Sequence, residues 1–93
     1  MSRLVASIKD AVRDDRYWIT EHADERLELR GFTPWQLAAG LEDARLLENR
    51  PHTLPFPSVV VEQILPDGTT VEAVWSWSVK TRKARLVTVY YRE

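Results

Sequence analysis

Residues 58–91 decide the fold: SVVVEQILPDGTTVEAVWSWSVKTRKARLVTVYY. Three runs in this stretch are rich in β-branched and aromatic residues, the composition typical of strands. Pro66-Asp67-Gly68-Thr69 separates the first two runs with residue types that favour turns, and a second polar turn, residues 80–83, precedes the third run. Short turns join antiparallel neighbours, so the stretch predicts an antiparallel meander. Its predicted strands are residues 58–65, 70–78 and 84–91.

Upstream of the meander the apolar residues recur with the helical period of 3.6, and helix start and stop signals divide that region into three helices. The first helix is capped by Ser2 and ends near Asp14-Asp15. The other two predicted helices are residues 21–30, between the N-cap Thr20 and Gly31, and a helix that opens at Thr33-Pro34 with a capping box to Gln36 and ends near Asp43.

Three segments connect these elements. Residues 17–20 are short, aromatic and β-branched, which predicts an extended segment. Residues 45–49 fit either a strand or the tail of the third helix. Three prolines predict an irregular loop over residues 50–57, because proline blocks ladder hydrogen bonds. Helices followed by a meander indicate an α+β fold, and 93 residues form a single domain over residues 1–93.

Composition excludes several classes of protein. With 44% hydrophobic and 29% charged residues the chain is globular rather than disordered, and it has no apolar run of the ~20 residues that a membrane span requires. It contains no Cys, and its two histidines lie far apart, so no disulfide framework, metal site or cofactor site is expected. The first residues are too quickly charged for a secretory signal. A cytoplasmic location is expected.

Charge is distributed unevenly although the net charge is only −1. Between Ala73 and Arg92 there are five basic residues and no acidic residue. Such a patch attracts anions, whereas the alternative is that it serves solubility alone. The candidate contacts to a nucleic-acid backbone are Lys80, Arg82, Lys83 and Arg85.

A cationic stripe marks the second predicted helix. His22, Arg26 and Arg30 are four residues apart and fall within about 80° of one another on the helical wheel. Neither arginine has an acidic residue three or four positions away, although such pairs are usual on a solvated helix. The stripe therefore forms either an anion site or ion pairs with distant acids such as Glu62 or Glu72.

The last strand is expected to alternate its side chains between the two sheet faces. Uninterrupted alternation places Leu86, Thr88 and Tyr90 on one face and Arg85, Val87, Val89 and Tyr91 on the other. Trp75 and Trp77 likewise share a face, where they either belong to the core or offer rings on which bases stack.

The motif Thr20-x-His22-Ala23-x-x-Arg26-Leu27-x-x-Arg30-Gly31-Phe32, with Asp67-Gly68 and Val87-Thr88-Val89-Tyr90 downstream, resembles domain-of-unknown-function family 4258 over about residues 18–91. That family is similar in architecture to RelE-like toxins of the barnase–colicin–RelE group of metal-independent ribonucleases. The resemblance implies N-terminal helices on one face of an antiparallel sheet of about four strands. Its polar positions fall on His22, Arg26, Arg30, Thr88 and Tyr90. Members often carry a histidine in the strand after the Asp-Gly turn, whereas this chain has Glu72-Ala73-Val74.

Two functions follow as hypotheses. One is an endoribonuclease toxin, in which His22 acts as acid or base, Arg26 and Arg30 hold the phosphate, and Tyr90 orients it or donates a proton. Thr88 would hydrogen-bond nearby, and the basic turn would contact flanking phosphates. RNA or the ribosome and a cognate antitoxin are the expected partners. The alternative is a non-catalytic module that pairs its aromatic sheet or an edge strand with another protein.

Overall fold

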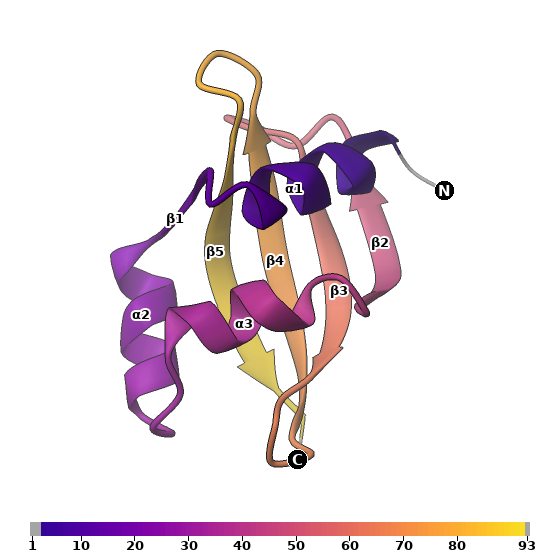
Figure 1. The fold of residues 1–93 in the computed structure, drawn as a ribbon. Helices are drawn as coiled ribbons and strands as arrows, with labels where there is room; N and C mark the ends of the chain where they lie inside the picture. Colours follow the sequence, from indigo (N-terminus) through magenta and orange to yellow (C-terminus); the bar gives the residue numbers. More distant parts are fainter. Residues whose placement is uncertain (1–2, 93) are drawn as a thin grey trace.

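The structure is a computed structural model that describes residues 3–92. Within that range the chain forms three helices and one five-stranded sheet (Figure 1). Helices α1 and α3 cross one face of the sheet, and α2 lies beside β5 (Figure 1). Ser2, the predicted N-cap of the first helix, lies outside the described residues. In chain order the elements are α1 (Arg3–Arg13), β1 (Tyr17–Ile19), α2 (Glu21–Glu28), α3 (Pro34–Gly40), β2 (Arg45–Arg50), β3 (Ser58–Ile64), β4 (Thr70–Ser78) and β5 (Lys83–Tyr91).

The strands are arranged in the order β1-β5-β4-β3-β2. The pairs β2–β3, β3–β4 and β4–β5 are antiparallel, which confirms the predicted meander and the α+β class. The sheet has five strands rather than about four, and its edge strand β1 runs parallel to β5, with Tyr17 opposite Ala84. No hairpin joins β1 to β5, so a short turn does not fix their relative direction. Residues 45–49, left open between helix and strand, belong to β2.

The N-caps of α2 and α3 form at the predicted residues, Thr20 and Thr33. The Thr20 hydroxyl accepts a hydrogen bond from the Ala23 N–H at 3.1 Å and donates one to the Val87 carbonyl at 2.8 Å, so this N-cap also fastens α2 to β5. In α3 the Gln36 side chain accepts a hydrogen bond from the Thr33 N–H at 2.7 Å. Both helices are shorter than predicted, ending at Glu28 and Gly40 because the chain turns after each.

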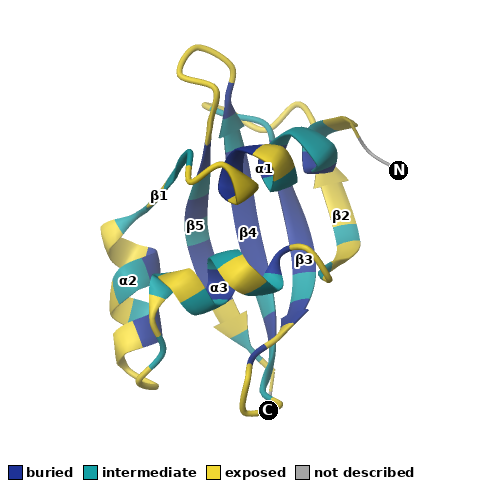
Figure 2. Cartoon of the chain, viewed as in Figure 1, coloured by how far each residue is buried: buried dark blue, intermediate teal, exposed yellow. Residues whose placement is uncertain are grey.

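The core lies between the sheet and the helices, as the colouring by burial shows (Figure 2). Its largest fully buried side chain is Trp75, which meets the Tyr17 ring edge-on at 6.2 Å between centroids. Trp75 therefore belongs to the core and does not offer a stacking surface. Among residues 3–92 no helix is long and apolar enough to span a membrane.

One polar group links the sheet to α3 inside this core. Gln63 is only 1% exposed; its amide donates to the Leu37 carbonyl at 2.8 Å and its oxygen accepts from the Trp75 indole N–H at 3.0 Å. A Cβ atom on Gly40 would lie 3.2 Å from the same amide nitrogen, so a side chain there would crowd this link. The carboxamide thus satisfies two groups that have no access to water.

Replacing this carboxamide tests its role in stability. Gln63→Leu leaves the Leu37 carbonyl and the Trp75 indole buried without partners, at about 1–3 kcal/mol each. We expect the free energy of unfolding to fall by about 2–4 kcal/mol in chemical denaturation. Ile64→Ala, at the neighbouring exposed position, is the control and should change stability little. Equal stability of the two variants would show that Gln63 does not link the layers.

Candidate functional site

The sheet face opposite α1 and α3 carries a cavity of about 260 Å³. It lies over the middle of β3, β4 and β5, and the loop at Thr53–Phe56 forms one side of it. Strand register places Ser58, Ser76 and Arg85 in one row across its floor, with Arg50 of β2 at the end of that row. The next row contains Val74 and Thr88. We call this the open-face cavity.

A β-bulge decides which residues of β5 reach this cavity. Trp75 pairs with Leu86 and Val74 pairs with Thr88, so Val87 is an extra residue without a counterpart in β4. Uninterrupted alternation predicted Arg85 on the face opposite Thr88 and Tyr90, and that prediction is wrong. The extra residue inverts the alternation, so Leu86 is buried with Trp75 while Arg85, Thr88 and Tyr90 all line the open-face cavity.

Thr88 supplies the most informative group in the cavity. Its side chain lines the cavity although the residue is only 6% exposed. Its hydroxyl is buried and makes no hydrogen bond to any residue within 3–92. A buried hydroxyl without a partner costs about 1–3 kcal/mol, so native structures rarely keep one without a reason. A ligand oxygen in the cavity would supply the missing partner.

Two arginines, Arg50 and Arg85, belong to the row of cross-strand neighbours that contains Ser76. Arg85 donates from Nε to the Ser76 hydroxyl at 3.2 Å, and its guanidinium lies 5.0 Å from the centroid of the Phe56 ring. Within the described chain Arg85 makes no salt bridge. Arg50 instead pairs with Glu48 at 2.9 Å, and this hydrogen bond raises the pKa of the Arg50 guanidinium. Arg85 therefore contributes the uncompensated positive charge.

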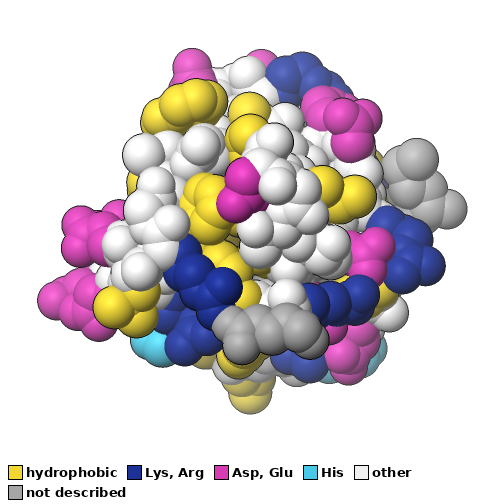
Figure 3. Space-filling view, turned by 90° about the horizontal axis from the view of Figure 1, so that it is seen from below, with side chains coloured by type: hydrophobic (Ala, Val, Ile, Leu, Met, Phe, Trp, Pro, Cys, Tyr) yellow, Lys and Arg dark blue, Asp and Glu magenta, His cyan; other side chains and the backbone are white. Residues whose placement is uncertain are grey.

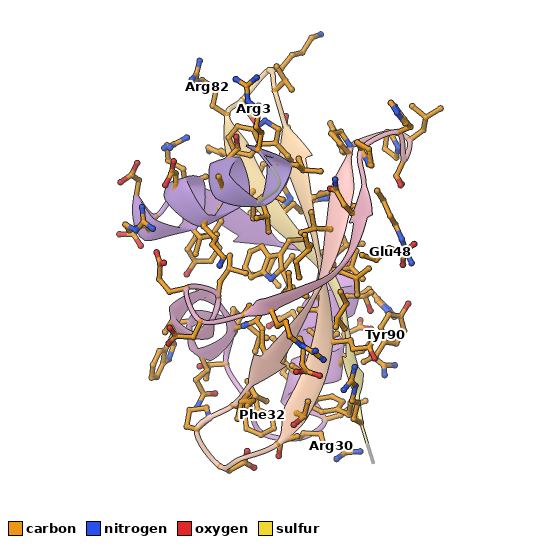
Figure 4. The ribbon with its side chains drawn as sticks, turned by 90° about the vertical axis from the view of Figure 1, so that its right-hand side faces the viewer. Arg3, Arg30, Phe32, Glu48, Arg82 and Tyr90 are labelled. Carbon is orange, nitrogen blue, oxygen red and sulfur yellow. The ribbon has the colours of Figure 1, made fainter. Side chains whose placement is uncertain are left out.

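Tyr90 stands at the mouth of the cavity and is 52% exposed. Figure 4 shows Tyr90 and Glu48 on the side of the sheet away from α1 and α3. The Arg26 guanidinium lies 5.7 Å from the centroid of the Tyr90 ring and donates from Nε to the Val89 carbonyl at 2.6 Å. Arg26 of α2 is thus held against β5 beside the cavity.

Arg26, the arginine of α2, does not pair with either acid suggested for it within the described residues. Glu62 and Glu72 pair with Arg92, and Glu62 also pairs with Arg45 at 3.3 Å. In the part of the chain that the structure describes, Arg26 makes no salt bridge; its partners are a backbone carbonyl and an aromatic ring. The space-filling view shows acidic side chains at the outer edge beside α2 and basic ones further in (Figure 3).

Arg30 and His22 lie outside the cavity. The Arg30 guanidinium sits 4.5 Å from the centroid of the Tyr91 ring, and the Tyr91 hydroxyl donates to the Arg26 carbonyl at 3.2 Å. Burial raises the pKa of the Tyr91 phenol, and the nearby charges of Arg30 and Arg26 oppose that shift. His22 is exposed in the first turn of α2. It lies one helical turn, about 6 Å, before Arg26 on the same side of the helix.

The residues of the predicted basic turn lie in two different environments. Lys80 lines a second, apolar cavity, whereas Arg82 and Lys83 are exposed. The turn projects beyond the end of the sheet (Figure 1). It is fastened at its base, where the Arg16 side chain binds the Arg82 carbonyl.

Sequence reasoning missed Arg50, Ser58 and Ser76 as residues of the site. Each joins Arg85 in one row only because four strands pair in a specific register. The polar Ser58 and Ser76 inside apolar strands were the available signal, since buried strands rarely carry hydroxyls without a purpose.

The fold and the cavity define a small α+β domain with a cationic, hydroxyl-lined cavity on the uncovered face of its sheet. The chain belongs to the family described as Domain of unknown function (DUF4258), which matches residues 19–91. All residues of the open-face cavity lie in that range. Comparison with curated proteins and with solved structures found no match. Across residues 3–92 no group of three or more His, Asp or Glu side chains is placed to hold a metal ion.

Removing the Thr88 hydroxyl should raise the free energy of unfolding of the ligand-free protein and lower its affinity for phosphate. Thr88→Val keeps the shape of the side chain and removes the unpartnered buried hydroxyl. We expect the ligand-free protein to gain about 1 kcal/mol in free energy of unfolding. Affinity for inorganic phosphate, followed by NMR titration, should fall on the order of 10- to 100-fold, because a hydrogen bond to a charged group is lost.

Thr70→Val is the control, since Thr70 lies on β4 outside the cavity. It should leave phosphate binding unchanged. If Thr88→Val loses stability and binds phosphate normally, the hydroxyl has a structural role and the cavity is not an anion site.

Proposed function

We propose that this protein is a metal-independent endoribonuclease of the RelE-like type, acting as the toxin of a toxin–antitoxin pair. One observation carries the proposal: the open-face cavity brings together Arg85, the unpartnered Thr88 hydroxyl and Tyr90. These groups match the needs of a bound phosphodiester, namely positive charge, a hydrogen-bond donor and a group able to transfer a proton. The resemblance to RelE-like toxins supports the same class by analogy of fold.

RNA cleavage without a metal follows a defined course. The ribose 2′-oxygen attacks the phosphorus and loses its proton to a base, while the bond from phosphorus to the 5′-oxygen breaks. That oxygen takes up a proton from an acid, leaving a 2′,3′-cyclic phosphate and a 5′-hydroxyl. The phosphoryl oxygens gain negative charge on the way, so cations and hydrogen-bond donors around them accelerate the reaction.

Residues of the site divide these tasks in the proposed mechanism. Arg85 and Arg26 bind the phosphoryl oxygens, and guanidinium groups suit this because they donate two parallel hydrogen bonds. Thr88 donates its hydroxyl proton to one of those oxygens. Tyr90 and His22 form the proton-transfer pair, Tyr90 from the cavity mouth and His22 from the flanking helix.

An interaction module without catalysis is the second candidate function. Its supporting observation is β2, a strand at the edge of the sheet whose residues are almost all exposed. Such an edge accepts an additional strand from a partner through backbone hydrogen bonds. A cognate antitoxin would use the same property, so the edge is compatible with both functions, and RNA cleavage distinguishes them.

Two substitutions test the proton-transfer pair. Tyr90→Phe keeps the ring beside Arg26, and His22→Gln changes an exposed side chain, so neither should disturb folding. Each should lower the rate of RNA cleavage by about 10²–10⁴-fold, the usual contribution of a general acid or base. Cleavage is measured on ribosome-bound and free RNA in the presence of a chelator.

His52→Gln, in the exposed loop, is the matched histidine control and should cleave normally. Full activity of His22→Gln alone would assign the proton transfers to Tyr90 and another group. Expression of the wild-type chain without a partner should slow growth, whereas Arg85→Gln should not. A protein that cleaves neither free nor ribosome-bound RNA and does not slow growth would leave the interaction module as the function.

Salt dependence tests the basic turn. Each phosphate contact to single-stranded RNA lowers the slope of log affinity against log salt by about 0.7, so three or four contacts give roughly −2 to −3. Lys83→Ala should flatten the slope by about one contact without changing base preference. Lys9→Ala is the control, because the Lys9 amino group binds the Glu42 carbonyl on the helix side. An unchanged slope in Lys83→Ala would show that the turn serves solubility alone.

A further inference from the structure

A second cavity adjoins the open-face cavity and has a different character. Its volume is about 410 Å³, and the residues that line it include Trp18, Phe56 and Trp77, with Val79 and Lys80 from the turn after β4. The volume falls in the range of roughly 300–1,000 Å³ that is usual for small-molecule sites. We call this the aromatic cleft.

The aromatic cleft leaves apolar surface in contact with water. Trp18 is 38% exposed and Val79 is 72% exposed. An isolated exposed apolar residue needs no explanation, but several that line one concave site mark a place where a ligand binds. The indole of Trp18 is available to such a ligand, unlike that of Trp75, which is fully buried in the core.

The two cavities share a wall. Pro55 and Phe56 line both, and the Phe56 ring carries the Arg85 guanidinium at 5.0 Å from its centroid. An occupant that extends from one cavity into the other therefore passes from a cationic, hydroxyl-lined site to an aromatic one across the wall formed by Pro55 and Phe56. Among residues 3–92 no Asp or Glu side chain lines either cavity.

We propose that the aromatic cleft binds the nucleobase next to the phosphate held in the open-face cavity. A nucleotide joins an anion to a flat apolar ring at short range, which is the pairing that the two adjoining cavities accommodate. Aromatic side chains stack on bases of any sequence, and Lys80 at the cleft supplies positive charge for the next phosphate. This inference rests on the proposed function and specifies its substrate as single-stranded RNA with an unstacked base.

Two probes of equal charge test the cleft. One is a 2′-O-methyl tetrauridylate, which resists cleavage because its 2′-oxygen is blocked, and the other is the same backbone with all four bases absent. The base-bearing probe should bind about 5- to 100-fold more tightly, as base–aromatic stacking provides. It should also quench tryptophan fluorescence, whereas the abasic probe should not.

Trp18→Leu should remove most of the difference in affinity between the two probes and leave the affinity for the abasic probe unchanged. Trp35→Leu is the matched control, because Trp35 is 63% exposed on α3 and lies outside both cavities. It should keep the full difference. Phe56→Leu, in the loop, is the second variant if Trp18→Leu fails to fold, and it should also reduce the difference.

The outcomes separate this inference from the proposed function. Equal binding of the two probes overturns the base cleft and leaves the phosphate site intact. Failure of the folded protein to bind either probe overturns both. If an acidic peptide that contains an aromatic residue binds more tightly than the tetrauridylate, the cleft is a site for a protein partner. That result would overturn the nucleobase proposal.

Discussion

Strands β4 and β5 pair in antiparallel register on both sides of Val87, where β5 carries one residue that β4 does not match. In an unbroken strand the side chains alternate strictly, so Leu86 and Thr88 would face the same side. The bulge lets Leu86 enter the core with Trp75 while Thr88 faces the open side with Arg85. A shift of one residue moves every following side chain to the other face. Both the core and the open-face cavity therefore depend on this single extra residue.

Helix α2 is fixed to the same strand, and that attachment explains its charge pattern. Thr20 and Arg26 hydrogen-bond to the carbonyls of Val87 and Val89, so the helix runs alongside β5 next to the bulge. Arginines that bind carbonyls and aromatic rings need no acidic neighbour on their own helix, although exposed helices usually provide one. Arg26 is thus part of the packing of α2 against β5, and its guanidinium lies beside the Tyr90 ring.

Local signals in the sequence predict the α+β class, the meander and the caps at Thr20 and Thr33, because turn residues and caps act within a few positions. The pairing of β1 with β5 and the strand identity of β2 depend on contacts between distant segments. The periodicity of apolar residues within one segment carries no information about such contacts. The bulge at Val87 has the same origin, since no residue in the run LVTVYY distinguishes it from a regular strand. Thr88 and Tyr90 were predicted as site residues from the family resemblance. Arg85 was predicted as a contact to nucleic acid but on the wrong face, because the bulge is not visible in the sequence, and Arg50 was missed.

The energetics of the open face favour a ligand site over a surface that serves only to pair with a protein. An unpartnered buried hydroxyl lowers the stability of the isolated domain. A strand-pairing surface needs no such group, because it binds through backbone groups at the sheet edge, and that edge is β2 rather than the middle of the sheet. Groups held at a cost to stability are typical of sites organised for a bound anion. In the proposed function, a phosphate bound over β5 would satisfy Thr88 and Arg85 together.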